Sequence, residues 1–118
     1  MTKRHRNPAL MRSIHLSNPE CQVTGGCRNI TLDHLVPRAR GEGADHPDNL
    51  MPIEGTLHTA KHGGVNNRRV RMMQRHVMTL RQLDYVIATK GEAWLDRSYP
   101  LPDVAALAEL ERLRREAP

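Results

Sequence analysis

Five polar side chains between residues 30 and 64 have the types and the spacing of a metal centre with a general base beside it. They are Asp33, His34, Asn49, His58 and His62. His58 and His62 are four residues apart, so on a helix they share one face and can chelate one ion. Asp33 would add an anionic ligand. An imidazole titrates near neutrality, which suits His34 to take a proton from water.

The side chains can meet only if short elements bring them together. Apolar and polar residues alternate from residue 30 to residue 36, which predicts a strand that Pro37 ends. Asp33 and His34 would point to opposite faces of a regular strand, so the strand must end or bulge there. Residues 50–53 predict a second short strand, and residues 56–61 predict a short helix that Gly63 and Gly64 stop.

Asn49 is neutral and has no acid or base chemistry of its own. Its amide can bond to the His34 imidazole or to loop backbone, and so orient His34. An asparagine that simply forms a turn after Pro47 and Asp48 is the alternative.

The rest of the chain predicts helices around this centre. Residues 66–90 carry an apolar stripe at helical spacing, and residues 103–116 predict a final helix. We expect the final helix to pack on the long one, with dimerisation as the alternative. At 118 residues the whole chain, 1–118, predicts a single domain of α+β class, with a small hairpin inside a mainly helical fold.

Charge is unevenly distributed along the chain. The formal net charge is +5; residues 1–19 and 66–81 are basic without any acid, and residues 42–54 are acidic without Lys or Arg. Basic flanks around an acidic, histidine-containing centre suit a polyanion outside and a cation inside. Solvated charged helices are the alternative. No apolar run is long enough for a membrane span and no signal peptide precedes the chain, so we expect a cytoplasmic protein with reduced thiols.

The order of the motifs is more specific than any single piece. Asp33-His34 lies in LDHLVPRARG, Asn49 in DNLMPI, and the histidine pair in LHTAKHG. Over about residues 20–64 the sequence resembles the HNH endonucleases, also called ββα-metal or His-Me finger nucleases. It is most similar to small HNH proteins of phages and prophages, and its histidine pair is similar to that of the DNase colicins.

This resemblance implies a function and a set of roles. It implies a metal-dependent DNA endonuclease whose ββα-metal core spans about 20–64. His34 would be the general base, Asn49 the orienting residue, and Asp33, His58 and His62 the ligands of one Mg²⁺, Mn²⁺, Ni²⁺ or Zn²⁺ ion. Basic residues beside the cluster and on the long helix are candidate phosphate contacts: Arg38, Arg40, Lys61, Arg68, Arg71 and Arg75.

The chain departs from the family at its cysteines. Many HNH proteins hold a structural zinc with two Cys-x-x-Cys pairs, whereas only Cys21 and Cys27 occur here. We therefore expect no structural zinc. The alternatives to a nuclease are a DNA-binding accessory protein without activity, for example in phage packaging, and a small metal-binding interaction module. A homodimer or phage packaging proteins are further candidate partners beside DNA.

Overall fold

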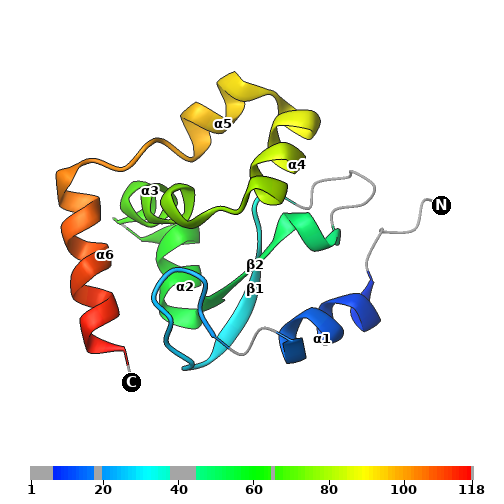
Figure 1. Cartoon of the computed structure of the whole chain (residues 1–118), viewed down its shortest axis with the longest axis horizontal. Coiled ribbons are helices and arrows are strands. Elements are labelled where there is room, and N and C mark those ends of the chain that lie inside the picture. The colour runs from blue at the N-terminus through cyan, green and yellow to red at the C-terminus, as the bar shows by residue number, and fades with distance from the viewer. Residues whose placement is uncertain (1–6, 18–19, 38–44, 65, 118) are drawn as a thin grey trace.

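The computed structural model describes residues 7–17, 20–37, 45–64 and 66–117. Within them the chain is α+β and mostly helical, with a two-stranded antiparallel sheet (Figure 1). The strands are β1 (Ile30–His34) and β2 (Leu50–Glu54), and a 3₁₀ helix, η1 (Pro47–Asn49), precedes β2. The helices are α1 (Pro8–Ser17), α2 (Gly55–Gly63), α3 (Asn67–Val77), α4 (Leu80–Lys90), α5 (Glu92–Ser98) and α6 (Val104–Glu116). The predicted α+β class and the order strand, strand, helix are confirmed.

The hairpin fixes where α2 begins. β1 and β2 pair without a bulge from Ile30 opposite Glu54 to His34 opposite Leu50. The helix follows β2 directly, because Glu54 is still extended and serves as its N-cap residue. The Gly55 N–H donates to the Asn29 carbonyl at 2.9 Å, which ties the start of α2 to the residue before β1. As a result α2 packs against both strands.

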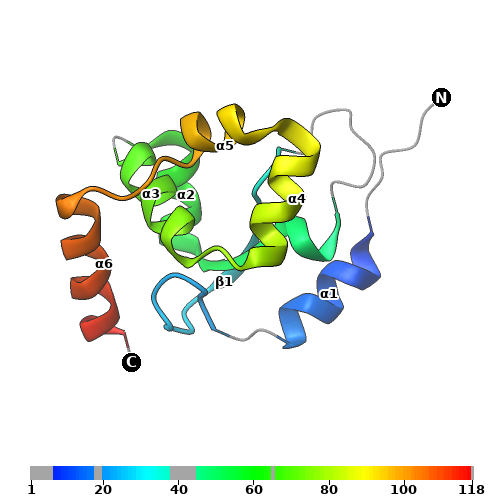
Figure 2. The same cartoon turned by 45° about the horizontal axis from the view of Figure 1, so that its top comes forward.

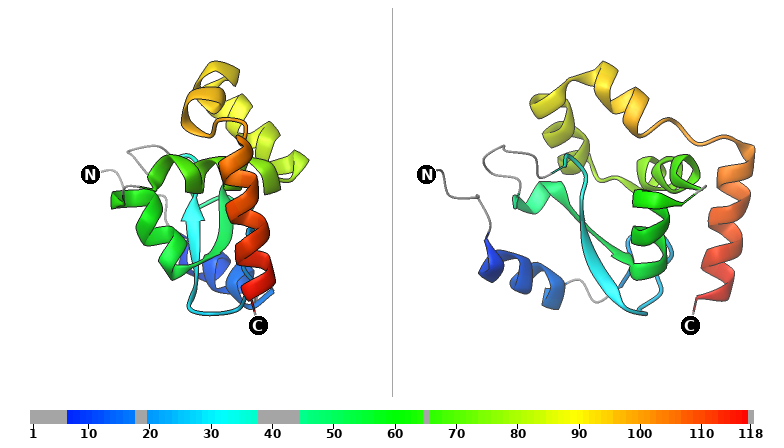
Figure 3. Two further views of the ribbon diagram at one scale, coloured as in Figure 1. Left: turned by 90° about the vertical axis from the view of Figure 1, so that its left-hand side faces the viewer. Right: turned by 180° about the vertical axis from the view of Figure 1, so that it is seen from behind.

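The polar face of β1 is the face that α2 covers. Thr31 and Asp33 both contact His58 on α2, and Asp33 is fully buried. Ile30 and Leu32 alternate with them and are only half-buried. The helix α1 contacts β1, and Figure 3 shows α1 on one side of the hairpin, with α2, α3 and α6 on the other. The alternation therefore predicts the strand correctly, but the one buried residue of β1 is the polar Asp33.

The prediction of one long helix over residues 66–90 is wrong, because two helices, α3 and α4, occupy this range. The chain breaks at Met78, whose backbone is extended, and α4 starts at Leu80. Thr79 and Gln82 form a capping box, in which the Thr79 hydroxyl accepts from the Gln82 N–H and the Gln82 side chain accepts from the Thr79 N–H. This T-x-x-Q signal is readable in the sequence, and it overrides the continuous apolar stripe.

The core lies between the hairpin and the C-terminal helices. Tyr99, at the end of α5, is its largest fully buried side chain, whereas Trp94 is only half-buried. The final helix is confirmed: Asp103 caps it, accepting from the Ala106 N–H at 2.8 Å, and it packs on α3. Figure 2 shows α1 and α6 at opposite ends of the molecule. Cys21 is buried, Cys27 is exposed, and both are free thiols.

Candidate metal centre

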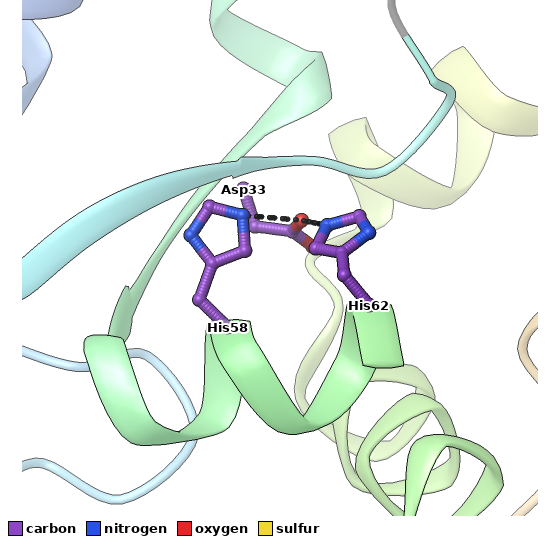
Figure 4. A group of neighbouring side chains, drawn as sticks. All are labelled: Asp33, His58 and His62. Atoms are coloured by element: carbon purple, nitrogen blue, oxygen red, sulfur yellow. Dashed lines mark hydrogen bonds and ion pairs between the residues drawn. The ribbon is translucent and has the colours of Figure 1, made fainter. Parts of the chain in front are cut away.

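Three of the five predicted side chains converge between β1 and α2. His58 and His62 rise from successive turns of α2, with ring centroids 5.0 Å apart, and Asp33 points toward them from β1 (Figure 4). The Nε2 atoms of His58 and His62 lie 3.4 and 3.3 Å from Asp33 Oδ1. One ligand atom from each residue lies within 4.8 Å of the others. Two imidazole nitrogens and a carboxylate oxygen at this spacing can hold one metal ion.

The two oxygens of Asp33 have different partners. Oδ2 accepts from the Lys61 ammonium and, at 2.8 Å, from the Gln74 amide. Oδ1 faces the two histidines. Donors on one oxygen fix the carboxylate plane, so the other oxygen is presented toward α2 in a defined direction, as second-shell partners do for metal ligands.

Lys61 is part of this support and is almost completely buried, with 1% of its side chain exposed. Its ammonium also donates to the Tyr99 hydroxyl at 2.7 Å, and Tyr99 in turn donates to the Leu35 carbonyl. Burial lowers the pKa of Lys61 to about 8, an effect that the Asp33 carboxylate opposes. Lys61 is thus a buried cation at neutral pH. This position corrects the expectation that Lys61 contacts phosphates.

Tyr99 and Gln74 are functional neighbours that the sequence analysis missed. Burial raises the pKa of the Tyr99 hydroxyl, and the Asp33 charge raises it further, so the hydroxyl remains protonated and can donate. Gln74 lies on the buried side of α3, where glutamine breaks an apolar pattern. A polar residue inside an apolar stripe is the signal that could have pointed to it.

His58 has a hydrogen-bond partner at Nδ1, the ring nitrogen other than the one near Asp33, and this bond bears on its tautomer. The Thr31 hydroxyl has one proton and donates it to the Ile53 carbonyl at 3.2 Å. With the hydroxyl proton on the Ile53 carbonyl, the His58 Nδ1, 2.7 Å from the same hydroxyl oxygen, is the donor to it. Burial lowers the pKa of His58, with the Asp33 charge acting against this. The neutral ring then directs the lone pair of Nε2 at Asp33 Oδ1.

The cluster is open on one side. A cavity of about 350 Å³ adjoins it, lined by Asn29, Thr31, Gly55, Thr59 and the two histidines. His62 is more than half exposed, and His58 is partly exposed. Three protein ligands beside an open cavity leave coordination positions for water or substrate, as catalytic metal sites require.

His34 is not a member of the cluster. It is the last residue of β1, and its Nε2 lies 2.6 Å from Asp45 Oδ1. Asp45 is buried, and its other oxygen accepts from the Asn7 N–H at 2.6 Å. The charge of a protonated His34 is one of the causes that lower the pKa of His58, so the two rings are close enough to interact. Sequence reasoning noted the acidic segment around Asp45 but did not pair Asp45 with His34.

Asn49 bonds to backbone at the end of β1. Its amide oxygen accepts from the Val36 N–H at 2.8 Å, and its amide nitrogen donates to the Val36 carbonyl at 3.0 Å. The Asn49 carbonyl also accepts from the Leu35 N–H at 2.9 Å. Two kinds of partner were expected for the Asn49 amide, the His34 imidazole or loop backbone, and these contacts are with backbone. Asn49 therefore fixes the segment that directly follows His34.

The arginines predicted to contact phosphate differ in their surroundings. Arg38 and Arg40 lie outside the described residues. Arg68 is exposed, but Arg75 donates to Asp96 at 3.0 Å and to the Tyr99 carbonyl at 2.9 Å, which ties it to α5. Arg71 lies over the Tyr99 ring. Of the three helix arginines, Arg75 is therefore engaged with α5, whereas Arg68 is exposed.

Comparison with known proteins does not place this chain in a family. No family model matches this chain, and neither a curated protein nor a solved structure matches it. In the described part of the chain, no helix has both the length and the apolar character needed to cross a bilayer.

Proposed function

We propose that this chain is a metal-dependent DNA endonuclease of the HNH type, which hydrolyses phosphodiester bonds to leave 5′-phosphate and 3′-hydroxyl ends. In this proposal β1, β2 and α2 are the hairpin and helix of a ββα-metal finger. Support comes from the order of the motifs along the chain and from the meeting of Asp33, His58 and His62.

The observation that carries the proposal is the contact between His58 and Asp33. In the neutral tautomer whose Nδ1–H donates to the Thr31 hydroxyl oxygen, the lone pair on His58 Nε2 faces a carboxylate oxygen 3.4 Å away. Two acceptors directed at each other repel unless a proton or a metal ion lies between them, and burial lowers the pKa of His58, which disfavours the proton. A structural histidine would instead turn a proton toward the carboxylate. The donor set therefore fits a metal ion.

The ligand types indicate which metals fit. Two imidazoles and one carboxylate suit Zn²⁺, Ni²⁺ and Mn²⁺, and the carboxylate with open water positions also admits Mg²⁺. A divalent ion held by these residues supplies positive charge to the scissile phosphate and the leaving oxygen.

The remaining residues handle the proton and the geometry. His34 takes a proton from the attacking water as general base. Asp45 accepts from His34 Nε2, so it fixes the ring and stabilises its charged form once the proton arrives. Asn49 holds the backbone at Val36, and Lys61 with Gln74 holds the Asp33 carboxylate.

A plasmid assay tests the proposal directly. Supercoiled DNA is incubated with the protein and Mg²⁺, Mn²⁺, Ni²⁺ or Zn²⁺, with and without a chelator. Nicking should require metal and should disappear in His34→Ala. It should persist in His76→Ala, a matched control because His76 is exposed on α3, outside the cluster.

Each alternative has its own result in the same assay. Salt-sensitive retardation of DNA without nicking in any metal would indicate a DNA-binding accessory protein instead. Stoichiometric metal uptake with neither nicking nor retardation would indicate a metal-binding interaction module. Nicking that survives in His34→Ala would remove His34 from the role of general base.

A further inference from the structure

A second, strongly basic cavity lies between the start of α3 and the end of α5. It has a volume of about 280 Å³, and its lining includes Arg68 and Arg71 from α3 and Trp94 and Arg97 from α5. Of the described residues that line it, none is Asp or Glu. A cavity with three guanidinium groups and no carboxylate in its described wall favours an anion.

The arginines that line the cavity are placed to bind a ligand from solvent. Arg71 is held in place, with its guanidinium 5.3 Å from the centre of the Tyr99 ring and its Nε donating to the Asn67 side chain at 3.1 Å. Arg68 lies one turn earlier on α3 and is exposed, as is Arg97. Within the described residues neither Arg68 nor Arg97 pairs with a carboxylate, in contrast to Arg75, which pairs with Asp96.

We propose that this cavity binds a phosphate of a nucleic-acid strand, with the attached nucleoside against Trp94. Guanidinium groups present several N–H donors in a fixed plane and match phosphate oxygens. The volume is close to the lower end of small-molecule pockets, so it holds more than a bare phosphate. An aromatic wall beside a basic groove is how single strands are bound without sequence preference.

The cavity is connected to the metal centre through Tyr99. Arg71 lies over the Tyr99 ring on the cavity side, and Lys61 lies 4.9 Å from the centre of the same ring. Lys61 in turn donates to Asp33. A strand anchored here is therefore held by an arginine that contacts the same Tyr99 ring as Lys61 of the metal centre. Binding of the strand does not depend on the proposed function; only its identification as the substrate rests on that function.

Trp94 makes the test direct, because it is the only tryptophan of the chain. Tryptophan fluorescence is titrated with a short oligothymidylate in the presence of a chelator, so that binding is measured without cleavage. Arg97→Gln is compared with Arg81→Gln, an exposed arginine on α4 outside the cavity. Arg68→Gln serves as a second cavity variant. Inorganic phosphate at the same phosphate concentration is the competing ligand.

We expect saturable quenching that weakens with salt. Arg97→Gln and Arg68→Gln should each weaken binding several-fold and reduce the slope of log K against log salt by about 0.7, the value for one phosphate contact of a single strand. Arg81→Gln should bind like the wild type. Quenching that inorganic phosphate reproduces equally, or that both cavity variants retain in full, would overturn the proposal.

The two proposals fail separately. Metal-dependent nicking without any Trp94 response would overturn the cavity and leave the nuclease standing. A Trp94 response that depends on Arg97, in a protein that nicks no DNA, would support the cavity and count against the nuclease.

Discussion

Replacing Lys61 with methionine should destabilise the protein strongly when metal is absent. Methionine keeps most of the volume of the lysine stem but removes the ammonium that donates to Asp33 and to the Tyr99 hydroxyl. Asp33 is fully buried, and Lys61 is 1% exposed. The variant would thus retain a buried carboxylate without its counter-ion.

The size of the effect follows from that burial. Removing one partner of a buried ion pair costs about 3–5 kcal/mol, because the other charge is left uncompensated. Small domains unfold with about 5–15 kcal/mol in total, so the loss is a large part of the stability. A divalent ion at Asp33 supplies the missing positive charge. Metal should therefore stabilise Lys61→Met more than the wild type, and saturation at 100 times Kd alone contributes about 2.7 kcal/mol.

Chemical denaturation with chelator and then with Mn²⁺ measures both effects. Lys90→Met is the control, since Lys90 is exposed on α4 and its ammonium lies over the Trp94 ring, so it should change the free energy of unfolding by less than about 1 kcal/mol. Tyr99→Phe is a milder variant, which removes one buried hydroxyl and should cost about 1–3 kcal/mol. If Lys61→Met were no less stable than Lys90→Met in chelator, the buried ion pair would not exist as described.

Four further outcomes are expected. His34→Ala should retain metal uptake in calorimetric titration while His58→Ala weakens it; equal losses would refute the division of roles. Asp45→Asn should lower kcat with KM and metal uptake unchanged, and Asp45→Ala should lower kcat at least as much. A change in KM alone would argue against a role of Asp45 in positioning His34. Asn49→Ala should lower the free energy of unfolding by about 1–3 kcal/mol for each Val36 group left without its partner, measured by denaturant titration. Metal affinity should fall as pH falls through the imidazole range, because protons compete for the ligand nitrogens; burial lowers the pKa of His58, so the fall should come at lower pH than for an exposed pair.

Local spacing predicted the parts of the centre that depend on one element. The i, i+4 separation placed His58 and His62 on one face of a helix, and alternation placed Asp33 on a strand. Glycine after the histidines predicted where the helix ends. Each of these inferences needs only the geometry of a helix or a strand, which repeats along the sequence.

Partners from distant segments were not predictable in the same way. Tyr99 and Gln74 reach Asp33 and Lys61 only because α3 and α5 pack over the hairpin. Asp45 contacts His34 although it lies 11 residues later, a separation that no periodic pattern in the sequence links. Lys61 is the exception. It lies three residues after His58 and shares the face of α2 that meets Asp33, so helical spacing alone could have placed it inside.

The charges of the centre indicate what completes it. Lys61 and Asp33 form a buried pair whose charges cancel, and burial lowers the pKa of His58, which favours its neutral form. A divalent ion added to this set leaves a net positive charge beside the open cavity at His58 and His62. A closed structural site would offset that charge with thiolates or a second carboxylate. In the proposed nuclease, a bound phosphodiester would supply the balancing negative charge at the ion.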